Sequence, residues 1–435
     1  MKFCILCIGS HGDIRPYVAL GVGLKAEAHE VWIASHKKAC SLCEKYNLNF
    51  KLVDGDLTEL INSENTQKEL KGNILSKILK IMCAFKKILK IQLPMSLDAA
   101  AGADVLIYSP AAFAGPHIAE YLRIPSFLMH LQPEIRTKFH PSHLFPNQKS
   151  LKGINFLLGH FLSEQLFWQP IRRYVNKWRK EILGIKKMHF LGPKYDPLSK
   201  NTHTLVAFSH HLIPRPIDWG PHIHMTNFCL LNESENWSPP QELEKFLRSQ
   251  ETIVYLGFGS LTEACHIDTV REIIDVLAKK NFGAIVQANL PGLKDIALPP
   301  TIFPLIYAPH DWLFPRVKAV IHHGGVGTTA AGLYAGKPTL IMPFVWDQFN
   351  WGKMVEDLGV GPKYLSINKF NKEKFSYNLE KLVSDPLYQH NALKIMNKLN
   401  TEDNGIKKNV NRIFEILATL CILTLHLSLI AINDF

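Results

Sequence analysis

The residues of this chain best suited to chemistry lie between positions 307 and 352. An apolar run at 320–321 leads into His322-His323-Gly324-Gly325-Val326-Gly327-Thr328-Thr329, and a helix-forming sequence follows. A strand, a glycine-rich turn and a helix N-terminus together form an anion site, because backbone N–H groups and the positive end of the helix dipole face the ligand. Glycine lets the backbone approach phosphate oxygens, the threonines add hydroxyl donors, and His323 can add a charge-assisted hydrogen bond. The pattern therefore predicts a phosphate site.

Two polar residues downstream indicate what the phosphate belongs to. Asp347 and Gln348 supply a carboxylate and an amide, the groups that bind the vicinal hydroxyls of a sugar. The order expected for NAD, a first strand followed by G-x-G-x-x-G, is absent from Ile8-Gly9-Ser10-His11-Gly12-Asp13. A nucleotide-sugar diphosphate therefore fits this segment better than a dinucleotide does.

The elements that must position these residues alternate between short apolar runs and helix-length segments. The expected strands are residues 3–8, 31–35, 50–53, 105–108 and 127–130, then 252–256, 284–287, 302–305, 320–322 and 339–342. Prolines 214, 216 and 221 and the polar stretch 232–240 interrupt the series and indicate an interdomain connection. We predict an α/β protein of two Rossmann-like domains facing each other across a cleft, at 1–222 and 223–400, followed by a C-terminal helix and apolar tail at 401–435.

Composition limits the class of protein. The 435 residues are 47% hydrophobic and 20% charged, which excludes intrinsic disorder, collagen-like sequence and a disulfide-stapled miniprotein. There are 49 Lys+Arg against 38 Asp+Glu, and this net charge of +11 favours anionic partners such as phosphates, nucleotides or acidic lipid headgroups. Eight cysteines include two C-x-x-C pairs, Cys4/Cys7 and Cys40/Cys43, whose separation is too long for a zinc site, so reduced thiols are expected.

Three segments of the chain, its two ends and residues 71–95, bear on where in the cell the protein is found. The apolar run 3–8 is too short for a signal peptide and indicates the first strand of a cytoplasmic domain. Residues 416–432 are nearly all apolar and lie at the short limit for a membrane span, so a span, a helix packed on the protein and a membrane-anchored tail all stay open. Residues 71–95 form an amphipathic stretch with a lysine face, which fits either a surface helix over the sheet or an interfacial helix on acidic membrane.

The segment 309–352 closely resembles the donor-binding signature of GT-B glycosyltransferases, in particular the UDP-glucose:sterol glucosyltransferases and related macrolide and glycolipid transferases. Further stretches match in the same order: GSHGDIRPYVALG at 9–21, GADVLIYSP at 102–110, the Arg215-Pro216…Trp219…His222 crossover, and VYLGFGSL at 254–261. The resemblance spans roughly residues 1 to 400. It implies the GT-B fold and an inverting transfer without metal or other cofactor, with the donor bound by the C-terminal domain and the acceptor by the N-terminal one.

The resemblance also assigns roles to single residues. Asp13 is expected to be the general base; its structural alternative is the N-cap of a helix beginning near Pro16. His11, where the family usually has arginine, is expected to assist catalysis, orient the acceptor or pack. The match also implies the donor-binding residues. Tyr307 would stack on the uracil base, and His310 would lie close to the nucleotide. The diphosphate would be bound by Gly259, Ser260, His323, Gly325, Gly327, Thr328 and Thr329, and the sugar by Trp346, Asp347 and Gln348. The D-x-D triplet at 54–56 is expected to be a turn rather than a metal site.

Together these expectations describe a transferase that moves a hexose, glucose from UDP-glucose, to a hydroxyl of a sterol or another bulky lipid. Its partners would be the UDP-sugar donor, the lipid acceptor and an anionic membrane surface, with no nucleic acid. One alternative keeps the fold and donor but uses a soluble macrolide or polyketide aglycone. Another is a degenerate transferase that binds lipid or membrane as an adaptor.

Overall fold

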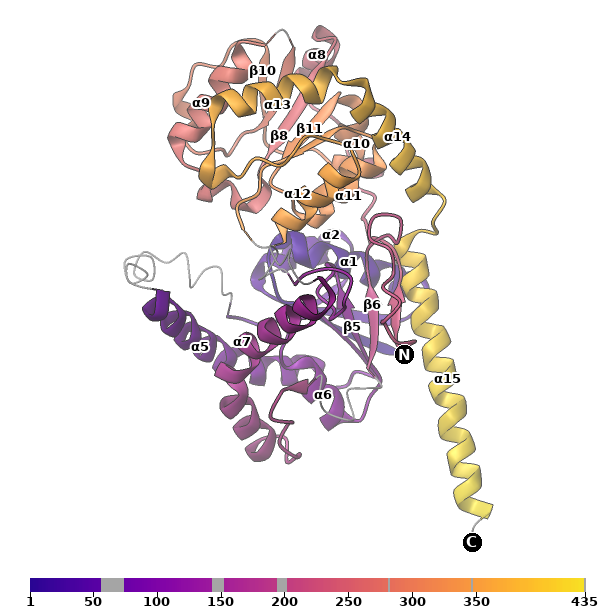
Figure 1. The fold of residues 1–435 in the computed structure, drawn as a ribbon. Coiled ribbons are helices and arrows are strands. Elements are labelled where there is room, and N and C mark those ends of the chain that lie inside the picture. The colour runs from indigo at the N-terminus through magenta and orange to yellow at the C-terminus, as the bar shows by residue number, and fades with distance from the viewer. Residues whose placement is uncertain (56–73, 143–151, 194–201, 281, 346, 434–435) are drawn as a thin grey trace. The chain divides into compact units, whose positions relative to one another are not determined.

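The computed structural model describes residues 1–55, 74–142, 152–193, 202–280, 282–345 and 347–433 (Figure 1). The described residues form two compact units, each built on its own parallel sheet. Unit 1 comprises Met1–Phe208, Arg215–Leu230 and Asn404–Phe435, and unit 2 comprises Ser209–Pro214 and Leu231–Asp403. The chain therefore passes between the units several times, and the predicted boundary at 222/223 lies within unit 1.

Unit 1 contains a seven-stranded parallel sheet in the order β3-β2-β1-β4-β5-β6-β7. Its strands are β1 (Lys2–Leu6), β2 (Glu30–Ser35), β3 (Asn49–Leu52), β4 (Val105–Tyr108), β5 (Ser126–His130), β6 (His203–Val206) and β7 (Ile223–Met225). Its helices are α1 (His11–Ala26), α2 (Cys40–Lys45), α5 (Ile74–Ala100), α6 (Gly115–Leu122), α7 (Lys152–Glu181) and α15 (Gly405–Asn433). Apart from the exposed Lys2 at the start of β1, the central strands β1 and β4 are buried and apolar, because helices cover both faces of a parallel sheet.

Unit 2 contains a five-stranded parallel sheet in the order β10-β9-β8-β11-β12. Its strands are β8 (Ile253–Gly257), β9 (Gly283–Gln287), β10 (Ile302–Leu305), β11 (Ala319–His322) and β12 (Thr339–Ile341). The helices are α8 (Gln241–Ser249), α9 (Ile267–Ala278), α10 (His310–Leu313), α11 (Val326–Tyr334), α12 (Gln348–Asp357), α13 (Lys372–Ser384) and α14 (Pro386–Asn400). A short 3-10 turn, η5 (Gly259–Ala264), follows β8.

In each sheet the strand order reverses between two central neighbours, β1 and β4 in unit 1 and β8 and β11 in unit 2. Loops leaving the carboxyl ends of such a pair diverge to opposite faces of the sheet and leave room for a ligand. Both predicted motifs lie at these points, since Asp13 follows β1 and the histidine-glycine turn follows β11.

The helix of residues 71–95 is present as α5, and its C-terminal half packs on unit 1. Phe85 makes edge contacts with Phe113 and Phe167, and Leu89 and Leu93 are buried. These contacts agree with a helix covering the sheet over residues 85–93; residues 71–73 lie outside the described part of the chain, as do the side chains of 74–84.

The start of the C-terminal helix α15 also packs on unit 1. Val410, Ile413 and Ile416 are buried, and Phe414 contacts Phe3 edge-on. The side chains of residues 423–435, which make up most of the predicted apolar tail, lie outside the described residues. Within the described part, no helix is both long enough and apolar enough to cross a membrane.

Candidate functional site

Asp13 lies in the first turn of α1, directly after the strand β1. The helix begins at His11 rather than near Pro16, and its N-cap is Ser10; Asp13 is therefore not the N-cap itself but the third helical residue of a capping box, which still gives it a structural role at the helix start. The Asp13 carboxylate instead accepts hydrogen bonds of 2.8 Å from both the backbone N–H and the hydroxyl of Ser10. These bonds fix the direction of the carboxylate at the sheet's reversal point.

The surroundings of Asp13 favour its protonated form. Loss of hydration raises the pKa of the Asp13 carboxyl above 3.8; the two hydrogen bonds from Ser10 oppose this rise, and the negative charge of Glu134 adds to it. A carboxylate with a raised pKa is a stronger proton acceptor than an exposed aspartate, which suits a general base. His11 is exposed at the first helical position.

Gly9 shows how closely the turn is built around Asp13. Its φ is +152°, and a methyl group at this position would lie 2.8 Å from the Asp13 Cβ and 2.9 Å from its Oδ2. Glycine is therefore required at this position for the carboxylate to occupy its place.

A cavity of about 300 Å³ in unit 1 lies away from this turn. It is lined by Pro125 and Ser126 at the start of β5 and by Thr202 and His203 at the start of β6. In a parallel sheet the starts of strands lie at the edge opposite to their carboxyl ends, so this cavity does not adjoin Asp13.

In unit 2 the turn after β8 is held by a residue that the sequence analysis did not identify, Gln287 at the end of β9. Its Oε1 accepts from the backbone N–H groups of Phe258 (2.8 Å) and Gly259 (2.9 Å), and its Nε2 donates to the Gly259 carbonyl (3.1 Å). Gly259 has a φ of +58°, and Gly259 and Ser260 are exposed at the carboxyl end of the sheet. The clue in the sequence was a polar residue ending an apolar strand.

His323 brings the two predicted diphosphate segments together. A methyl group at Gly259 would lie 3.0 Å from the His323 Cε1, and one at Gly325 would lie 2.5 Å from its Nε2. Burial lowers the pKa of His323 to about 4, so the ring is neutral at pH 7 by itself. Its Nδ1 is buried without a hydrogen-bond partner among the described residues. An unsatisfied buried nitrogen is costly, and a ligand oxygen would satisfy it.

His322, by contrast, has a structural role, as expected. It is fully buried, and its Nδ1 accepts a hydrogen bond of 3.0 Å from the Gly324 N–H. Burial lowers the pKa of His322 well below 6.5.

The helix α11 begins where the predicted anion site requires it. Gly325 is its N-cap and has no side-chain acceptor, so the N–H groups of the first turn stay available to a ligand or water. Space around Gly327 is open to 4 Å. The Thr329 hydroxyl donates to the Gly325 carbonyl (2.9 Å) and is buried, so the half-buried Thr328 is the better-placed hydroxyl donor.

The predicted sugar residues lie at the start of α12. Asp347 is its half-buried N-cap. The Gln348 Oε1 accepts from the backbone N–H groups of Phe344 (2.8 Å) and Val345 (3.2 Å), so this oxygen shapes the loop and only the amide nitrogen is left for a hydroxyl. Trp346 lies outside the described residues.

Of the two residues expected near the nucleotide, Tyr307 lies between β10 and α10, and His310 is the first residue of α10. Tyr307 is 47% exposed, as an aromatic ring that stacks on a ligand must be. His310 stacks on Phe314 with ring centroids 4.4 Å apart. That contact fixes the orientation of the His310 ring.

The cysteines and the D-x-D triplet show no metal geometry among the described residues. Cys4, Cys7 and Cys43 are buried and all three are free thiols. Burial raises the pKa of the Cys4 thiol to about 12, which disfavours the thiolate that a metal requires. Asp54 accepts from the Gly55 N–H as in a turn, and Asp56 lies outside the described residues.

Comparisons with known proteins agree with this geometry. The glycosyltransferase family 28 N-terminal domain matches residues 3–141, and the erythromycin biosynthesis protein CIII-like C-terminal domain matches residues 271–407. The glycotransferase of kitacinnamycin superimposes with a TM-score of 0.70 at 17% identity, covering 95% of this chain and 98% of that one. VinC in complex with DTDP gives a TM-score of 0.65 at 17% identity, with coverage of 96% and 99%. The chain has the GT-B fold.

Sequence relatives confirm the predicted resemblance to sterol glucosyltransferases. Sterol 3-beta-glucosyltransferase of Eremothecium gossypii is 34% identical over 416 residues, 92% of this chain and 33% of the relative. The protein of the same name from Saccharomyces cerevisiae is 33% identical over 426 residues, 95% of this chain and 35% of the relative. This GT-B chain thus spans about a third of the length of the curated relatives that it matches.

Proposed function

We propose that this chain is a glycosyltransferase that moves glucose from UDP-glucose to the hydroxyl of a sterol, with inversion at the anomeric carbon and without a metal ion. The observation that carries the proposal is the convergence of the Gly259 turn and the Gly325 helix start on His323. Neutral donors aimed at one position suit a diphosphate leaving group, because they stabilise its growing negative charge. The sterol acceptor comes from the names of the relatives.

The chemistry needs one base and one set of hydrogen-bond donors. The Asp13 carboxylate takes the proton of the acceptor hydroxyl as its oxygen attacks the anomeric carbon from the side opposite the diphosphate. The bond to UDP breaks as the new bond forms, so the configuration inverts. The backbone N–H groups at the start of α11, the Thr328 hydroxyl and an N–H of His323 stabilise the departing charge in place of a cation.

The direct test is transfer of labelled glucose from UDP-glucose to ergosterol or cholesterol, resolved by mass spectrometry. Wild-type protein should form a β-linked steryl glucoside with EDTA present, and Asp13→Asn should lose turnover by orders of magnitude while retaining UDP affinity. Asp98→Asn, an exposed aspartate of the same unit, is the matched control. If only macrolide aglycones were glycosylated, they would replace sterols as the proposed acceptor. If the protein bound UDP but formed no product, the alternative of a degenerate transferase acting as an adaptor would be favoured.

We also propose that unit 1 contacts acidic membrane through α7 and the adjoining part of α5. Four apolar side chains at a spacing of four residues are exposed on α7: Ile154 (79%), Leu158 (51%), Leu162 (43%) and Leu166 (49%). The neighbouring helix α5 exposes Lys86, Lys87 and Lys90, and the two helices meet through Phe85 and Phe167. An apolar stripe beside lysines suits the surface of an anionic bilayer.

Vesicle sedimentation distinguishes membrane binding by this α7 surface from membrane binding by the apolar tail. Leu158→Glu with Leu162→Glu should reduce binding to phosphatidylserine-containing vesicles, while Leu387→Glu, a 65% exposed position in unit 2, should not. Truncation for the tail should begin after Ile422, because Ile413 and Ile416 are buried parts of unit 1. Unchanged sedimentation of the double variant would refute the α7 surface.

A further inference from the structure

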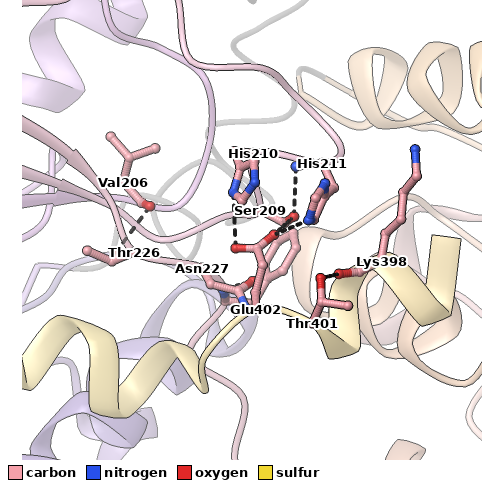
Figure 2. Close-up of polar contacts among 10 residues, drawn as sticks. Val206, Ser209, His210, His211, Thr226, Asn227, Lys398, Thr401 and Glu402 are labelled. Carbon is pink, nitrogen blue, oxygen red and sulfur yellow. Dashed lines mark hydrogen bonds and ion pairs between the residues drawn. The ribbon is translucent and has the colours of Figure 1, made fainter.

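Two histidines and a glutamate gather in unit 2 at residues that the proposed transfer reaction does not use. The His210 Nδ1 lies 3.4 Å from the Glu402 Oε2, and the His211 Nε2 lies 4.0 Å from the Glu402 Oε1. One ligand atom from each residue lies within 4.8 Å of the other two, and no other such trio occurs in the described parts of the chain. Figure 2 shows both rings turned toward the carboxylate.

The cluster is held by hydrogen bonds on both sides. The Ser209 hydroxyl donates to the Glu402 carboxylate and accepts from the His211 N–H (3.0 Å). The N–H groups of Leu212 and Ile213 donate to the Ser209 carbonyl, which closes the turn that carries the two histidines. Glu402 lies just past the end of α14, where its N–H donates to the Leu399 carbonyl. Such outer contacts fix the direction of ligating side chains.

The electrostatics of the cluster favour a cation. The Glu402 side chain is only 3% exposed, and a carboxylate removed from water needs positive charge beside it. Two imidazole nitrogens and a carboxylate oxygen, all within 4.8 Å of one another, can offer lone pairs to one cation.

We propose that His210, His211 and Glu402 bind one divalent transition-metal ion of the Zn²⁺ type. Two imidazole nitrogens and a carboxylate oxygen are ligands that Zn²⁺ accepts in a tetrahedral site, with the fourth position open. Ligand atoms in such a site lie about 3.4 Å apart, so modest rotations of the exposed His210 and the partly exposed His211 would complete the geometry. The ion would tie the turn at 209–213 to the end of α14, two segments that border points where the chain passes between units.

Zinc titration of the whole chain tests the proposal. Protein stripped with EDTA and returned to metal-free buffer at pH 7.5 is titrated with ZnCl₂ in a calorimeter, and Co²⁺ absorption reports the ligand geometry. We expect one ion per chain, and affinity at least about tenfold weaker in His211→Gln and in Glu402→Gln, since each removes one of three ligands.

The matched control is His203→Gln, because His203 and His224 form a histidine pair with nitrogens 3.2 Å apart in unit 1. This variant should bind Zn²⁺ like the wild type. If Glu402→Gln proves unstable, the partly exposed His211→Gln carries the test alone. Absence of saturable binding in the wild type, or equal affinity in the wild type and His211→Gln, would overturn the proposal. Loss of binding in His203→Gln alone would move the site to unit 1 and overturn it as well.

Discussion

Gln287 offers the sharpest test of how unit 2 prepares its diphosphate site. Replacing it with leucine keeps the approximate volume of the side chain but removes the three hydrogen bonds that hold Phe258 and Gly259. The turn then has to be ordered by the ligand, so the variant should bind UDP more weakly than the wild type.

The size of the effect follows from those bonds. Each intramolecular hydrogen bond contributes a net of about 0.5–1.5 kcal/mol, and part of the loss falls on the free protein rather than on binding. We therefore expect binding to lose about 1–3 kcal/mol, which is roughly a 5- to 150-fold weaker affinity for UDP.

Calorimetric titration with UDP measures this change directly. Gln241→Leu, an exposed amide at the start of α8 in the same unit, is the matched control and should bind UDP as the wild type does. Circular dichroism verifies that the variants fold. A Gln287→Leu protein that folds and binds UDP within about twofold of wild type would refute the idea that this side chain preorganises the site.

Three further predictions follow from the described contacts. Because burial raises the pKa of Asp13, transfer activity should begin to fall on acidification at a pH above 3.8. For the same reason the folded state disfavours the Asp13 carboxylate at pH 7, so Asp13→Asn should not lower the melting temperature there. A loss of activity only at or below pH 3.8, or a lower melting temperature of the variant, would contradict this. Gly325→Ala should fold normally but weaken UDP binding, because its methyl group would lie 2.5 Å from the His323 Nε2, and unchanged affinity would show that the position of His323 does not matter. Arg179 is 1% exposed and pairs with Glu120 through hydrogen bonds of 2.8 and 3.0 Å. Arg179→Met should therefore lower the free energy of unfolding, measured in urea, by about 3 kcal/mol. The control is Arg173→Met at an exposed position, whose free energy of unfolding should stay near that of the wild type.

The strands of both sheets illustrate where sequence patterns suffice. Ten apolar runs were predicted and all ten correspond to observed strands. A central strand that is buried on both faces must be apolar, whereas the edge strands β3 and β10 are partly exposed. The short strands β6 and β7 were missed. Their sequences, HTLV and IHM, contain histidines and are too brief to stand out as apolar runs; β6 pairs with β5, and β7 pairs with β6.

The chemistry that could be predicted is local in the chain. A strand, glycines and threonines in succession at 320–329 form an anion-binding turn through their own backbone geometry, and a neighbouring glycine leaves space for Asp13. Which distant side chains contact each other was decided by the tertiary structure. Gln287 reaches Gly259 across 28 residues, and Ser209 reaches Glu402 across 193. Side-chain partners so far apart meet only when parallel strands and crossover helices bring their loops to the same place, and no local pattern of residues encodes that meeting.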